Sequence, residues 1–132
     1  MTALTPLECE VAKMLLAGED GALAVLRDQL KHAQVRSREM TGVGFYAEFA
    51  LPFDAVRIKS QPNFKLGDVT GKATNVQHGL GFLLYVTDGG IAMLEGYTYD
   101  EPWPDEVQGL VLSYLEGKDR NLDIVRRIMS KG

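Results

Sequence analysis

Residues 78–104, HGLGFLLYVTDGGIAMLEGYTYDEPWP, decide the fold of this chain. Two apolar segments, 81–87 and 91–99, flank the turn sequence Asp88-Gly89-Gly90. Because glycine adopts positive φ without steric cost, this sequence predicts a β-hairpin closed by a two-residue turn, at either the first or the second pair of these residues. The continuous apolar character of 81–87 predicts a central strand that is covered on both faces or nearly so.

A two-residue turn also predicts which side chains share a face, because successive residues of a strand point to opposite sides. One face is expected to carry Phe82, Leu84, Val86, Ile91, Met93, Glu95 and Tyr97, and the other Leu83, Tyr85, Ala92, Leu94, Gly96 and Thr98. The carboxylate of Glu95 then lies in line with apolar neighbours, where its charge costs free energy unless it is paired. The alternative is a rim position, solvated or bridged to Arg or Lys.

Three helices are predicted outside the sheet region. Thr5 and Glu8 form a capping box for the first helix, and Gly18 ends it. Asp20 caps the second helix, so that the two form a helical hairpin with leucine stripes. Gly117 is expected to interrupt regular structure, and Asp119 to cap a terminal helix that follows it.

Further strands are predicted at 35–40, 42–51, 56–59 and 65–72. In the second of these segments Phe45, Ala47 and Phe49 share one face, with Tyr46 and Glu48 on the other. Residues 107–115 have two possible structures. The alternation of Leu110, Leu112 and Tyr114 predicts a strand, whereas Asp105-Glu106 could begin a helix, and we favour the strand. The expected fold is a single α+β domain over residues 1–132, with an N-terminal helical hairpin, a mainly antiparallel sheet of about five to six strands and a C-terminal helix.

Composition excludes several classes of protein. The 132 residues carry a formal net charge of −4, which argues against a nucleic-acid binder. Cys9 is the only cysteine, so no intrachain disulfide forms, and its helical setting favours packing over reactivity. No apolar run is long enough to span a bilayer, and the N-terminus lacks the pattern of a signal peptide, so we expect a cytoplasmic protein without membrane association.

No metal or cofactor motif is present in the sequence. His32 and His78 are far apart, one cysteine is too few for a structural zinc site, and the Gly-x-Gly sequences lack the lysine and remaining glycines of phosphate-binding loops. The candidate catalytic residues are therefore Glu95, Glu48 and His78, which would support general acid–base chemistry if they converged beside the tyrosines.

The candidate binding residues are Trp103, Tyr97, Tyr99 and Glu101. Proline on both sides holds Trp103 in place at low entropic cost, as suits a recognition anchor, and tryptophan is enriched in binding hot spots. The alternative is a lid, with the indole folded back over the edge of the sheet.

Three blocks carry a resemblance to a family: SREMTGVGFY at 37–46, HGLGF at 78–82 and LEGYTYDEPWP at 94–104. Together they resemble a family of short, uncharacterised bacterial proteins, and the resemblance covers most of the chain. It implies a bacterial stand-alone domain and brings no activity or catalytic residue.

Two functions remain open at this stage. The first is a small non-catalytic binding or interaction module for a protein partner or for self-association, favoured by the acidic charge, Trp103 and the absence of a catalytic motif. The second is a small hydrolase- or isomerase-like enzyme that uses Glu95, Glu48 and His78 in a cleft beside the sheet.

Overall fold

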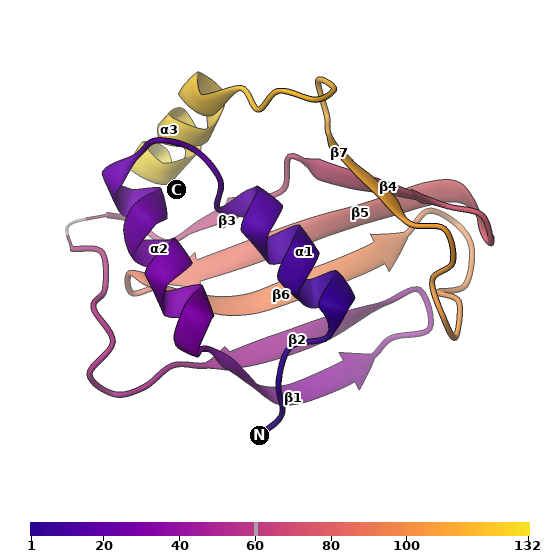
Figure 1. Cartoon of the computed structure of the whole chain (residues 1–132), viewed down its shortest axis with the longest axis horizontal. Coiled ribbons are helices and arrows are strands. Elements are labelled where there is room, and N and C mark those ends of the chain that lie inside the picture. Colours follow the sequence, from indigo (N-terminus) through magenta and orange to yellow (C-terminus); the bar gives the residue numbers. More distant parts are fainter. Residues whose placement is uncertain (60) are drawn as a thin grey trace.

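The predicted hairpin forms the centre of the sheet. The computed structural model describes residues 1–59 and 61–132, and in it β5 (Val76–Thr87) and β6 (Gly90–Thr98) pair antiparallel (Figure 1). Asp88 and Gly89 form the turn, with φ of 51° and 72°. Two successive left-handed residues are the requirement of a type I′ turn, whose twist matches that of the flanking strands.

Five other strands extend this hairpin into one antiparallel sheet of seven strands. They are β1 (Gln34–Met40), β2 (Gly44–Ala50), β3 (Phe64–Leu66), β4 (Val69–Ala73) and β7 (Val111–Tyr114). The order is β1-β2-β6-β5-β4-β7, and β3 pairs with β5. The predicted strand at 65–72 is present but interrupted at Gly67 and Asp68, so it counts as two. The α+β fold is confirmed.

An extra residue in β6 changes the predicted faces of the hairpin. Val86 pairs with Ile91, but Tyr85 pairs with Met93, so Ala92 has no partner of its own. This β-bulge reverses the alternation of every following residue. Leu94 therefore joins the buried side and Glu95 the opposite side, and the prediction that Glu95 lies in line with Phe82, Leu84 and Val86 is wrong.

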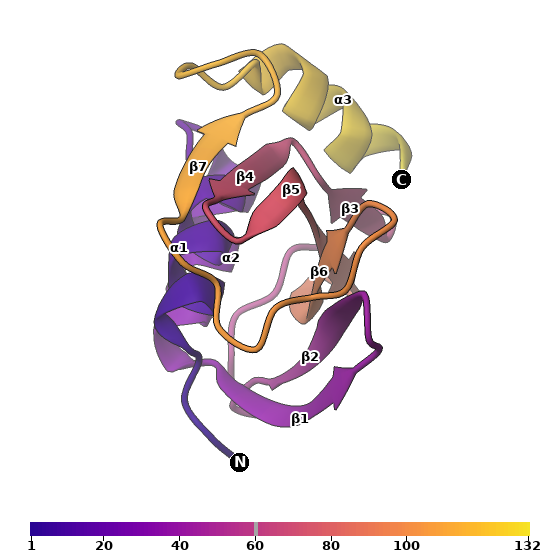
Figure 2. The same ribbon diagram turned by 90° about the vertical axis from the view of Figure 1, so that its right-hand side faces the viewer.

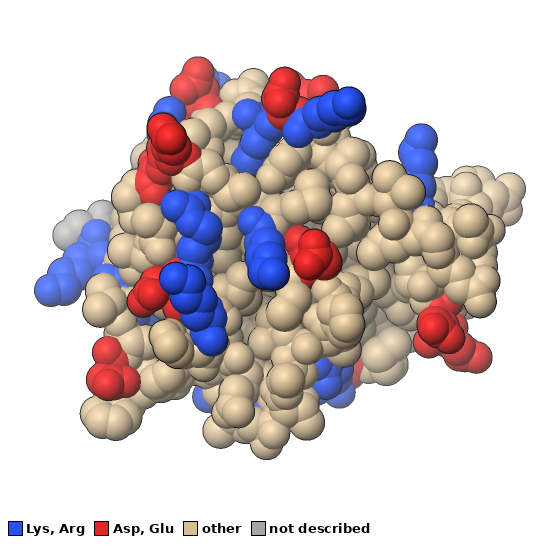
Figure 3. Space-filling model, in the orientation of Figure 1, with Lys and Arg blue, Asp and Glu red and all other residues tan. Residues whose placement is uncertain are grey.

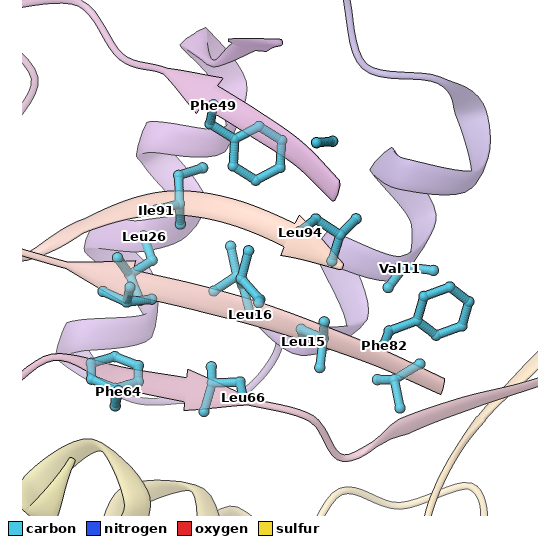
Figure 4. Packing of buried hydrophobic residues seen from close by; sticks show 14 of the residues in the cluster. Val11, Leu15, Leu16, Leu26, Phe49, Phe64, Leu66, Phe82, Ile91 and Leu94 are labelled. Atoms are coloured by element: carbon cyan, nitrogen blue, oxygen red, sulfur yellow. The ribbon is translucent and has the colours of Figure 1, made fainter. Parts of the chain in front are cut away.

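Two helices, α1 (Pro6–Leu15) and α2 (Gly21–His32), cover one side of the sheet, which curves around them (Figure 2). The predicted capping box of Thr5 and Glu8 is present, and Asp20 accepts hydrogen bonds from two N–H groups of α2. Apolar side chains of both helices point at those of the sheet (Figure 4). Fully buried members such as Phe82 and Leu94 each stabilise the fold by roughly 2 kcal/mol.

The third helix, α3 (Leu122–Lys131), packs against β3 at the edge of the sheet (Figure 1). Its N-cap is Asn121 and not the predicted Asp119, because the Asn121 side chain accepts from the Ile124 amide. Arg120 ties the preceding turn to the sheet through two hydrogen bonds to Asp68, of 2.8 and 2.9 Å. Among the described residues, no helix is long and apolar enough to cross a membrane.

Residues 52–59 carry no strand, contrary to the prediction for 56–59. The side chain of Gln29, which is 2% exposed, instead forms hydrogen bonds to backbone groups of this segment and of the hairpin. Its amide nitrogen donates to the carbonyls of Val56 and Gly89 at 2.8 and 2.9 Å, and its oxygen accepts from the Ile91 amide at 2.9 Å. One side chain of α2 thus satisfies three backbone groups beside the central turn.

Glu8 has a second role beyond its cap. Its carboxylate accepts two hydrogen bonds of 2.8 Å from the Arg38 guanidinium, which joins α1 to β1. Burial by itself raises the pKa of Glu8, but the hydrogen bonds from Arg38 and Thr5, with the charge of Arg38, outweigh it and lower the pKa. The ionised pair is therefore the stable form in the folded protein.

We expect Gln29→Ala to lower the free energy of unfolding by about 2–4 kcal/mol, because it removes three hydrogen bonds to the backbone, one of them from the buried Ile91 amide. Urea denaturation measures the loss. Gln108→Ala, at an exposed position, is the matched control and should change stability by less than about 0.5 kcal/mol. Equal effects of the two substitutions would contradict the role given to Gln29.

The Glu8–Arg38 pair predicts a pH-dependent contribution to stability. A carboxyl with a lowered folded pKa stabilises above its unfolded pKa of about 4.3, and this stabilisation is lost as pH falls through the folded value. Glu8→Gln should therefore cost roughly 2 kcal/mol at neutral pH and progressively less below about pH 4. Denaturation from pH 7 to 3 tests this, with Glu10→Gln, a neighbour on the exposed side of α1, expected to show no such trend.

Candidate functional site

Four of the five tyrosines gather on or beside the side of the sheet opposite α1 and α2. We call this surface the tyrosine face; it consists of Tyr46, Leu83, Tyr85, Met93, Glu95, Tyr97 and Tyr99, all of which are partly or well exposed. Figure 2 shows α1 and α2 on the other side of the sheet and α3 along its edge. Within residues 1–59 and 61–132, no helix covers the tyrosine face.

Glu95 lies at the centre of this face. It pairs across the sheet with Tyr46 on β2 and with Leu83 on β5. The Tyr85 hydroxyl donates a hydrogen bond of 2.8 Å to the Glu95 carboxylate. The carboxylate is thus oriented by a neighbour and keeps further acceptor positions, since an ionised carboxylate has about four lone-pair sites.

Tyr97 lies flat against the backbone of the neighbouring strand. It pairs with Gly81, and a Cβ atom on Gly81 would come within 2.4 Å of the Tyr97 ring. Only glycine leaves room for the ring at this position. Tyr99 packs edge-to-face on Tyr97 with ring centroids 5.5 Å apart, a favoured aromatic geometry. Both predicted residues therefore belong to one aromatic surface.

The phenols of this face stay protonated far above neutral pH. Burial, followed by the hydrogen bond to Glu95, raises the pKa of Tyr85 to about 12. Burial, followed by the contact with Tyr99, raises the pKa of Tyr97 to about 12. The charge of Glu95 is the main cause of the raised pKa of Tyr46. The hydroxyls are therefore hydrogen-bond donors and weak acids, unsuited to act as bases at neutral pH.

The three predicted catalytic residues do not surround one point. Glu48 lies on the same side of the sheet as Glu95 but opposite Met93, where Arg36 holds its carboxylate at 2.9 Å. Glu48 and Tyr85 line a hollow of about 470 Å³. His78 lies five residues before Leu83, the partner of Glu95, which is roughly 16 Å along a strand.

Glu101 and Trp103 lie away from the tyrosine face, in the segment 99–110 that crosses the end of the sheet from β6 to β7 (Figure 2). The Glu101 carboxylate accepts from the amides of Gln77 and His78 at 2.9 and 2.7 Å, which lowers its pKa. The role visible for Glu101 is thus to fasten this segment to the start of β5.

Trp103 packs on the side of the sheet that faces the helices. Its ring meets Phe45 edge-to-face at 5.3 Å, and its amide donates to the Gly42 carbonyl at 2.9 Å. The indole is partly buried against the core and also lines a surface groove. It therefore combines the position of a lid with that of an accessible aromatic side chain.

In the part of the chain that the structure describes, no group of three or more His, Cys, Asp or Glu side chains is placed to hold a metal ion. Cys9, for which packing was predicted over reactivity, is partly exposed on α1. The distinctive chemistry of the molecule remains the tyrosine face.

Tyr85 is not among the predicted site residues, because the predicted alternation places Tyr85 and Glu95 on opposite faces of the hairpin. The bulge at Ala92 brings them to the same face. A glycine often marks a bulge, but Ala92 and its neighbours Ile91 and Met93 are not glycines. One signal was available: among the residues of 93–98, Met93, Glu95 and Tyr97 are long, amphipathic or polar, as suits a partly exposed side.

We expect Glu95→Gln to lower the pKa of Tyr46 towards 10, because it removes the negative charge that disfavours the phenolate. Tyrosine ring-carbon NMR shifts, followed from pH 8 to 11, report the titration of each phenol. Glu48→Gln is the matched control and should leave Tyr46 nearly unchanged. A shift of equal size in the two variants would contradict the central position of Glu95.

The comparisons with known proteins add no further assignment. No protein-family model matches the chain, and no curated protein or solved structure matches it.

Proposed function

We propose that this protein is a non-catalytic binding module that contacts a partner protein through the tyrosine face. The observation that carries the proposal is the collection of four tyrosines and Met93 around one carboxylate on a side of the sheet that no described helix covers. Tyrosine and methionine are enriched in protein interfaces relative to the remaining surface.

The composition of the face suits recognition of a protein surface. Tyr46, Tyr85 and Tyr97 are anchored on strands, and Tyr97 is fixed further by its contact with Gly81. Rigid aromatic side chains contribute contact area while losing little conformational entropy on binding. Their hydroxyl groups supply hydrogen bonds at the rim of the contact.

Glu95 defines the chemistry of the partner. Its carboxylate has acceptor positions beyond the one used by Tyr85. Lys65 already lies over the Tyr85 ring, so the ring on which a planar cation can stack is that of Tyr46, which pairs with Glu95 across the sheet. An arginine guanidinium matches both features, since it binds carboxylates and stacks on aromatic rings. The expected partner therefore presents arginine within an otherwise apolar contact.

The alternative is an acid–base enzyme, which would need Glu95, Glu48 and His78 in one cleft. The register separates His78 from Glu95 along β5, and the raised pKa values of Tyr85 and Tyr97 remove the phenols as bases. The geometry favours the binding module.

The test compares wild type with Tyr46→Ser/Tyr97→Ser in affinity capture from extracts of the source cells, followed by calorimetry with the purified partner. We expect capture to depend on these tyrosines, with affinity reduced at least about tenfold, the effect of losing a binding hot spot. Glu95→Gln should weaken binding as well, and more so where the partner's contact is an arginine.

Phe53→Ser is the matched control, since Phe53 is a fully exposed aromatic residue outside the tyrosine face. It should leave capture unchanged. Equal binding by wild type and the double variant would refute the proposal. Light scattering measures whether the free protein self-associates. A dimer that is present in wild type and absent in the double variant would identify the partner as a second copy of this chain.

A further inference from the structure

A second surface, on the helix side of the molecule, has a different character. A groove of about 560 Å³ runs between the N-terminal half of α1 and the segment 99–110. Seven apolar residues line it: Pro6, Leu7, Met40, Phe45, Trp103, Val107 and Leu110. Its volume is within the range of sites that bind apolar groups.

The apolar lining is accessible rather than closed over. Met40 is 62% exposed at the end of β1, and Leu7, Trp103 and Val107 are each partly exposed. Phe45 supports the indole of Trp103 from beneath, so the floor is held by the sheet itself. An accessible apolar groove with a rigid floor fits the side chains of an inserted segment.

Negatively charged side chains outnumber positively charged ones in the lining of the groove. Its lining includes four carboxylates, of Glu8, Glu10, Asp105 and Glu106, and one cation, Arg38, which is paired with Glu8. Four negative charges against one positive charge leave a net charge of −3. Figure 3 shows largely uncharged surface beside α1, with acidic and basic groups at its borders. Lys13 lies 4.0 Å from the Glu10 carboxylate, so the excess negative charge rests on Asp105 and Glu106. A cationic occupant is therefore electrostatically complementary.

We infer that this groove binds a basic amphipathic helix of a partner protein, with apolar side chains against Trp103 and Val107 and Lys or Arg towards Asp105 and Glu106. A helix suits an apolar groove with one charged rim, because its opposite faces can differ in polarity. The site is separate from the tyrosine face, so this inference does not rest on the function proposed above.

Trp103 is the only tryptophan in the chain, so its fluorescence reports the groove directly. The probe is a synthetic peptide of about four helical turns, with leucine on one face and lysine on the other. Two comparison peptides replace either lysine with glutamate or leucine with serine. We expect a saturable blue shift of Trp103 emission with the leucine–lysine peptide and none with either comparison peptide.

Asp105→Asn/Glu106→Gln should weaken binding of the leucine–lysine peptide roughly tenfold, with a smaller dependence on salt. Both positions are exposed, so the fold should be retained, which circular dichroism checks. Asp28→Asn/Asp54→Asn removes two exposed carboxylates elsewhere and should leave binding unchanged. The inference is overturned by no saturable shift, by equal binding of a comparison peptide, or by equal losses in the two double variants.

Discussion

The bulge at Ala92 is the constraint on which the rest of the structure depends. A single unpaired residue in the central hairpin reverses the faces of everything after it in β6. Leu94 thereby enters the core, and Glu95 joins Tyr85 on the opposite side. Without the extra residue, the core would hold a carboxylate and the exposed side a leucine, and both changes cost free energy.

The bulge also needs support from outside the sheet. Gln29 of α2 accepts from the amide of Ile91, next to the bulge, and donates to the carbonyl of Gly89 in the turn. A buried backbone group without a partner costs about as much as a lost hydrogen bond, so the position of α2 and the geometry of the hairpin stabilise each other. The helix that closes the core is thus also the helix that fixes the turn.

The two sides of the molecule follow from this arrangement. On one side, α1 and α2 cover the core, and charged pairs such as Glu8–Arg38 join the helices to the sheet. On the other, Tyr97 rests on Gly81 and Tyr85 orients Glu95, so polar aromatic side chains take the place of a covering layer. Large, exposed and ordered aromatic groups of this kind are characteristic of binding surfaces.

The sequence by itself determined the local elements: a two-residue turn within Asp88-Gly89-Gly90, the helix caps at Thr5 and Asp20, and the residues of β2 that share a face. Each of these depends on neighbouring residues and on a short-range preference. Tertiary structure decided the pairing of Tyr85 with Glu95, the separation of His78 from both, and the long-range hydrogen bonds of Gln29. These depend on long-range pairing and register, and one inserted residue changes the register of β6 while the local pattern shows it only in the long or polar side chains of Met93, Glu95 and Tyr97.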